Sequence, residues 1–115
     1  MARFLIAGVA AALLATPALA DERTGYREIG AGDLVAAEQR LVAERRIFPS
    51  RPELMLNLAV VYQRTGRAAE ARALYREVLS TNAVALELRG GTSASSHVIA
   101  QAGLAQVAGE QMVAR

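Results

Sequence analysis

The sequence predicts an all-α protein, a short solenoid of antiparallel helix-turn-helix units that ends in a capping helix. Three observations predict this fold. The chain resembles itself at an offset of 34 residues, a period typical of stacked helix-turn-helix repeats. Its apolar residues recur at three- and four-residue spacing, which places them on one side of a helix. A glycine follows the central helical segment, where a left-handed residue commonly ends a helix.

The N-terminal segment has the pattern of a secretory signal peptide over residues 1–20. Arg3 precedes an apolar run that ends at Ala15, and small residues at Ala18 and Ala20 fit a cleavage site between Ala20 and Asp21. The alternative is an uncleaved anchor, but a bilayer core requires roughly 20 apolar residues. The chain also has no cysteine to carry a lipid. We therefore expect an exported protein, periplasmic or secreted, without stable membrane insertion after cleavage.

Composition excludes several classes of function. After removal of residues 1–20, twelve arginines face eleven acidic residues, a formal charge of +1. The two signs alternate along the chain, which is typical of solvated helix faces and not of a nucleic-acid-binding stripe. The sequence has neither lysine nor cysteine, which excludes a phosphate-loop lysine, a Schiff base and a thiolate metal site. We expect no nucleic-acid partner, no metal and no cofactor.

The internal repeat predicts one partial and one full unit within residues 21–83. The coinciding positions are Gly32 with Gly66, Ala37 with Ala71, Leu41 with Tyr75, and Pro49 with Ala83. The partial unit begins with a helix at 23–29, and Asp33 is expected to cap its second helix. The partial unit is thus shorter at its N-terminal end than the full unit that follows.

The full unit begins at Ser50, whose hydroxyl is expected to form a capping box with Glu53. Pro52 suits the first turn of a helix, because the amide that it lacks would have no helical partner there. This helix is predicted at about 52–64 and ends at Gly66. A second helix, at about 68–79, points four residues inward: Ala71, Leu74, Tyr75 and Val78.

These positions resemble the tetratricopeptide repeat over about residues 22–83. The resemblance rests on Leu58, Ala59, Tyr62, Gly66, Ala71 and Tyr75. It implies that the small Ala59 and Ala71 let the helices approach, and that the two tyrosines fill the space between neighbouring helices. Met55 stands where the family often has an aromatic residue, and Ala59 replaces its common glycine. Ala83 replaces the terminal proline, so the end of the repeat stays open.

The C-terminal part departs from the repeat pattern. Residues 84–92 indicate a linker or extended segment, and residues 93–115 a capping helix with a weakly apolar face. That face comprises Val98, Ile99, Ala102, Ala105 and Met112. Fewer than about three repeat units seldom form a stable core, so we expect self-association or docking on a partner.

The resemblance implies that a peptide or helix binds the concave face of the full unit's first helix. Leu56 and Val60 lie off the stripe formed by Met55 and Tyr62. The predicted contact residues are Leu56, Asn57, Val60, Gln63 and Arg64, of which the asparagine would hydrogen-bond the ligand backbone. Alternatively, Leu56 and Val60 pack against the preceding repeat, the terminal helix or residues 84–88. A carboxylate clamp is not supported, since Leu56 stands where a cation would be needed.

Catalysis has little support in the sequence. His97 is the only histidine, and one imidazole makes no cluster. Residues 91–95 resemble a nucleophile elbow only in part, because Ser95 stands where the motif has its final glycine. We therefore predict a non-catalytic periplasmic adaptor or assembly factor that binds a protein of the cell envelope. The alternatives are a structural subunit of a homo- or hetero-oligomer and, more remotely, a hydrolase built on Ser95 and His97.

Overall fold

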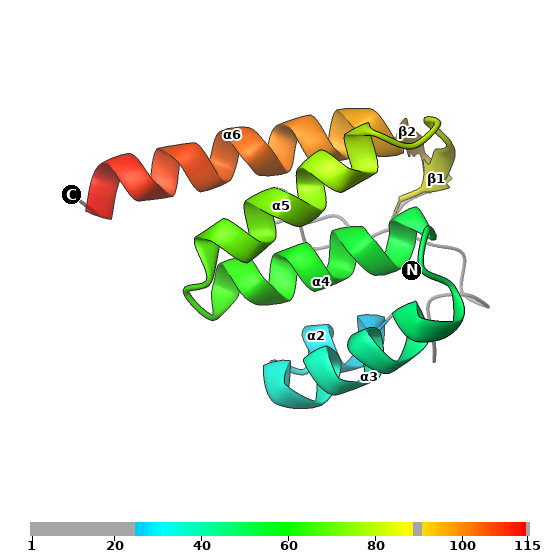
Figure 1. Ribbon diagram of the computed structural model, residues 1–115, viewed down its shortest axis with the longest axis horizontal. Helices are drawn as coiled ribbons and strands as arrows, with labels where there is room; N and C mark the ends of the chain where they lie inside the picture. The colour runs from blue at the N-terminus through cyan, green and yellow to red at the C-terminus, as the bar shows by residue number, and fades with distance from the viewer. Residues whose placement is uncertain (1–24, 89–90, 115) are drawn as a thin grey trace.

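A computed structural model describes residues 25–88 and 91–114, so the predicted signal peptide lies outside the described residues. The helices and strands follow one another along the chain in Figure 1: α2 (Tyr26–Gly30), α3 (Leu34–Ile47), α4 (Pro52–Arg64), α5 (Ala68–Leu79), β1 (Ala85–Glu87), β2 (Ser93–Ser95) and α6 (Ser96–Ala114).

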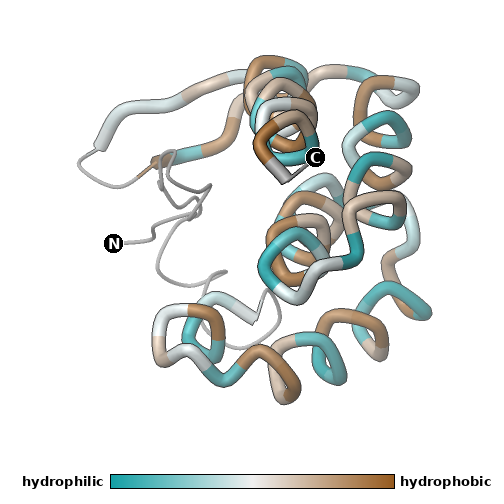
Figure 2. The backbone as a smooth tube through the Cα atoms, turned by 90° about the vertical axis from the view of Figure 1, so that its left-hand side faces the viewer, coloured by the Kyte–Doolittle hydropathy of each residue, from teal (hydrophilic) through white to brown (hydrophobic). Residues whose placement is uncertain are grey.

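Helix α4 lies at the centre of the fold. In Figure 2, α3 lies below α4, α6 lies above it and α5 runs beside it. Every residue from Leu54 to Val61 is buried, as expected for a helix that is apolar on all sides. The prediction of an all-α repeat architecture with a C-terminal packed helix is confirmed.

Helix boundaries follow local chemistry at two of the three predicted signals. Asp33 caps α3, because its carboxylate accepts a hydrogen bond from the Ala36 amide at 3.1 Å. Gly66 follows α4 with φ of 82°, a conformation that glycine adopts without strain. The capping box at Ser50 is wrong: α4 begins at Pro52 as predicted, but its N-cap is Arg51 and no side chain forms a cap hydrogen bond. Glu53 instead lies 3.7 Å from the Arg51 guanidinium.

Gly103 sets the approach of α6 to α5. A methyl group at Gly103 would lie 2.3 Å from Cζ of the buried Tyr75 ring, so only glycine permits this contact. Helix α6 packs against α5, and α4 packs against both α3 and α5.

The short hairpin β1–β2 lies between α5 and α6 in the chain. Its strands pair antiparallel, with Leu86 opposite Ala94, and they lengthen the connection between α5 and α6. Leu86 is buried in the core while its neighbours in β1 are exposed. The extended segment expected after residue 83 is thus a hairpin, whose second strand takes up residues 93–95.

Candidate interaction surfaces

Three of the five predicted groove residues are buried. The exposed fractions are 0% for Leu56, 4% for Asn57 and 1% for Val60, because α4 is enclosed by its neighbours. The expectation that a ligand contacts these three residues is therefore corrected: in this structure they belong to the interior. Packing against neighbouring segments was the alternative prediction for Leu56 and Val60, and their burial favours it.

Gln63 and Arg64 lie at the C-terminal end of α4. The Gln63 carbonyl accepts a hydrogen bond from the Tyr75 hydroxyl at 2.9 Å, and its amide donates to both Glu110 oxygens at 3.2 Å. Gln63 therefore joins α4, α5 and α6 and is not free for a ligand. Burial raises the pKa of the Tyr75 phenol, which keeps it a neutral donor. Arg64 is exposed.

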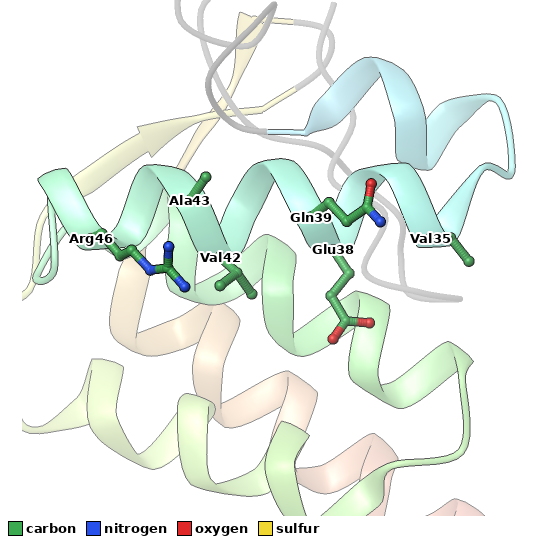
Figure 3. Close-up of a pocket in the computed structure, with 6 residues that line it drawn as sticks. All are labelled: Val35, Glu38, Gln39, Val42, Ala43 and Arg46. Carbon is green, nitrogen blue, oxygen red and sulfur yellow. The ribbon is translucent and has the colours of Figure 1, made fainter.

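A hollow lies along the side of α3 in Figure 3. Its volume is about 490 Å³, and it is lined by Val35, Glu38, Gln39, Val42, Ala43 and Arg46. Figure 3 shows Glu38, Val42 and Arg46 reaching from α3 toward the neighbouring helices. Val35 is 70% exposed and Val42 is half-buried. The hollow thus offers apolar surface beside charged groups.

A second hollow, of about 330 Å³, continues from the first and shares Val42 and Arg46 with it. Its lining adds Leu58 and Tyr62 from α4 and Arg45 from α3. We call the two hollows together the α3–α4 groove. Leu58 and Tyr62 are predicted structural repeat positions, whereas no sequence prediction covers the side of α3 that forms the other wall.

An ion pair closes one edge of the groove. Arg67 donates through Nη1 to Glu38 Oε2 at 3.0 Å and through Nη2 to Glu38 Oε1, and its guanidinium stacks 4.5 Å above the Tyr62 ring. The hydrogen bond from Arg67 lowers the pKa of the Glu38 carboxyl. Glu38 is therefore held ionised and pointed at the turn between α4 and α5.

The two arginines on the groove differ in their surroundings. Arg45 donates from Nη2 to Glu77 Oε2 and to the Pro49 carbonyl, both at 3.2 Å. Arg46 is exposed and forms no ion pair with any residue that the structure describes. The α3–α4 groove therefore has three components. These are apolar side chains such as Val42, the Glu38 carboxylate paired with Arg67, and Arg46, which has no ion pair among the described residues.

Ser95 and His97 do not form a nucleophile and base. The His97 ring donates from Nε2 to the Thr81 carbonyl at 2.7 Å, while the Ser95 hydroxyl accepts from the His97 backbone amide at 3.0 Å. Ser96 is buried and exchanges two hydrogen bonds with the Val84 backbone. The contacts of Ser96 and His97 join the start of α6 to the segment between α5 and β1, which is a structural role.

Over 25–88 and 91–114, no group of three or more His, Cys, Asp or Glu side chains could hold a metal ion. No helix in this part of the chain is long and apolar enough to cross a membrane.

Comparison with known families gives a match to the part of the fold from α4 to β1. Residues 53–88 match the family model of the tetratricopeptide repeat, a span that covers α4, α5 and β1. Neither a curated protein nor a solved structure matches the chain. The match and the helix packing support a tetratricopeptide-type repeat here. Such repeats are protein-interaction modules and are generally not catalytic.

Proposed function

We propose that this protein is a non-catalytic interaction module, an adaptor or assembly factor, that binds a peptide or helical segment of a cell-envelope protein. The repeat match supports the interaction role. The signal-peptide pattern of residues 1–20 supports export to the periplasm. The burial of Leu56, Asn57 and Val60 moves the proposed contact from the concave side of α4 to the α3–α4 groove.

The observation that carries this assignment is the exposed Val35 on a groove that also holds Arg46 without an ion pair among the described residues. A segment with an apolar side chain over Val35 and Val42 and a carboxylate near Arg46 complements both features. Apolar burial contributes about 25 cal/mol per Å².

Affinity capture from envelope extract tests the proposal. The bait is the tagged protein, compared with the double variant Val35→Asp/Arg46→Glu. Ala73→Asp is the matched control, because Ala73 is exposed on α5, outside the groove residues. Circular dichroism establishes that all three are folded. We expect one envelope protein to be captured by wild type and control and lost in the double variant. Equal capture by all three baits would refute the groove.

A second candidate function is a structural subunit of an oligomer that has no peptide groove. The specific observation in its favour is that the predicted groove residues Leu56 and Val60 serve internal packing. A structural subunit gains stability by association, so its unfolding midpoint rises with protein concentration. A midpoint that is independent of concentration would remove this candidate.

A further inference from the structure

The α3 side of the α3–α4 groove has a regular spacing. Val35 and Val42 are seven residues apart, and Arg46 follows four residues later, so all three lie on one side of α3. Figure 3 shows them along the helix, with Glu38 between the two valines. At the helical rise per residue, the two separations correspond to about 10.5 Å and about 6 Å along α3. We call Val35, Val42 and Arg46 the α3 contact row.

The spacing of the α3 contact row fits a helix better than an extended chain. A helix laid along α3 repeats both separations, so it can place one side chain opposite each member of the row. An extended chain presents a side chain on the same side about every 6.7 Å, which matches the shorter separation and misses the longer one. A helix also bonds its own backbone groups. That matters here because the Glu38 carboxylate is already bonded to Arg67, and the Arg45 guanidinium is bonded within the chain.

The unpaired charge of the groove indicates both the charge and the direction of the partner helix. Arg46 lies in the last turn of α3, is exposed and forms no ion pair with any described residue. A carboxylate opposite Arg46 is therefore complementary. In a helix that runs antiparallel to α3, this carboxylate falls in the first turn, where the helix dipole also favours negative charge. In a parallel helix it falls in the last turn, where the dipole opposes it.

The helices of this chain do not supply such a partner. A second α3 packed antiparallel would bring Val35 opposite Arg46, and its Glu38 is held by Arg67 of its own copy. A second α3 packed parallel would bring Arg46 opposite Arg46. Among the described helices, none has an acidic residue followed by apolar residues four and eleven positions later. The α3 contact row therefore fits a helix of another protein.

We propose that the α3–α4 groove binds one amphipathic helix of about three turns from another protein, antiparallel to α3. This helix has an acidic residue in its first turn and apolar residues four and eleven positions later. The acidic residue faces Arg46, and the two apolar side chains cover Val42 and Val35. The inference rests on the proposed function and deepens it, because it names the conformation, the direction and the residue pattern of the bound segment.

Fluorescence polarisation with labelled synthetic peptides tests the proposal on the protein recovered after export from the full-length gene. The probe is a peptide of about 15 residues, a length at which an isolated helix is marginally stable. It has glutamate first and leucine at its fifth and twelfth positions, in a background rich in alanine and glutamine. We expect a dissociation constant below about 1 mM, and absence of binding up to that concentration would overturn the proposal.

Two control peptides test the conformation and the direction of the bound segment. Proline at the eighth position breaks the helix, so that peptide should not bind. The peptide of reversed sequence places glutamate in the last turn and should bind about threefold more weakly. Equal binding of the proline peptide would contradict a helical occupant, and equal binding of the reversed peptide would contradict the antiparallel direction.

Protein variants test the charge at the end of the α3 contact row. Arg46→Glu should weaken binding of the glutamate peptide about threefold to fivefold, as expected for an exposed ion pair. It should also bind a peptide with lysine first more tightly than wild type does. Arg76→Glu is the matched control, because it makes the same charge change at an exposed position of α5 outside the groove residues. Equal weakening in the two variants would overturn the role of Arg46.

The peptide result can be separated from the affinity capture of a whole envelope protein. Suppose that wild type captures a protein that Val35→Asp/Arg46→Glu loses, while the glutamate peptide does not bind. The groove then functions as proposed, and the helical occupant is wrong. If capture is also insensitive to the double variant, the proposed function itself fails.

Discussion

Tyr75 and Gly103 meet across α5 and α6 so closely that a methyl group on Gly103 would lie 2.3 Å from the tyrosine ring. Cβ atoms do not approach a ring to this distance in real proteins. The position of the Tyr75 ring therefore requires a glycine at residue 103. The contact holds α6 against the repeat unit and positions Glu110 beside Gln63.

We predict that Gly103→Ala destabilises the protein. Overpacking a well-filled contact costs about 1–3 kcal/mol, which exceeds the about 0.5–1 kcal/mol that alanine gains over glycine within a helix. Urea unfolding followed by circular dichroism measures the change. Gly109→Ala is the control, since nothing lies within 4 Å of a Cβ there, and it should raise stability slightly. If both variants are equally stable, the close contact does not hold α6.

Removal of the Tyr75 hydroxyl should weaken the junction of three helices. Tyr75→Phe deletes the 2.9 Å hydrogen bond to Gln63 while keeping the buried ring. A typical hydrogen bond contributes about 0.5–1.5 kcal/mol, and water can reach the half-buried Gln63, so we expect a loss near the lower end. Equilibrium unfolding of Tyr75→Phe in a Gln63→Ala background is the control. The loss should vanish there, and its persistence would assign it to ring packing.

The ion pair between Glu38 and Arg67 should make stability depend on pH at the acid end. The hydrogen bond from Arg67 lowers the folded pKa of the Glu38 carboxyl below its ordinary value. The resulting stabilisation is therefore fully present above that value and is lost as pH falls through the lower folded pKa. Unfolding midpoints measured from neutral to acid pH should fall less steeply for Glu38→Gln than for wild type.

Arg67→Gln should likewise make the unfolding midpoint fall less steeply at acid pH, because it removes the hydrogen bond that lowers the pKa of Glu38. The double variant should match either single variant. If the unfolding midpoint of Glu38→Gln falls at acid pH as steeply as that of wild type, the ion pair does not contribute to folding.

Export and processing can be tested on the recovered protein. We predict that expression of the full chain in an exporting bacterial host yields a periplasmic product that begins at Asp21. Intact mass and N-terminal sequencing identify the first residue, and Ala20→Tyr should slow cleavage because a large side chain does not fit the small-residue site. An unprocessed chain that remains with the membrane fraction would support the anchor instead.

The sequence was sufficient wherever a local rule decides the structure. The cap at Asp33, the turn at Gly66 and the inward side of α5 follow from single residues or from helical spacing. The capping box failed because Arg51 takes the N-cap position, which moves Glu53 out of the required register.

Two other features depend on tertiary packing. The contact of Gly103 with Tyr75 was hidden because helical spacing does not show which residue of α6 meets α5. Leu56 and Val60 looked available because helical spacing shows which residues share a side but not whether another segment covers that side. The α3–α4 groove likewise arises from the angle at which two helices meet.

Site-specific photocross-linking in cells tests the central claim, that the α3–α4 groove binds a segment of an envelope protein. A photoreactive amino acid replaces Val35, which is 70% exposed at the groove, or Ala73, which is exposed on α5, as the comparison. We predict a discrete adduct with one envelope protein from position 35, reduced by Arg46→Glu and absent from position 73. Identical adducts from both positions, or none beyond the protein itself, would contradict the account.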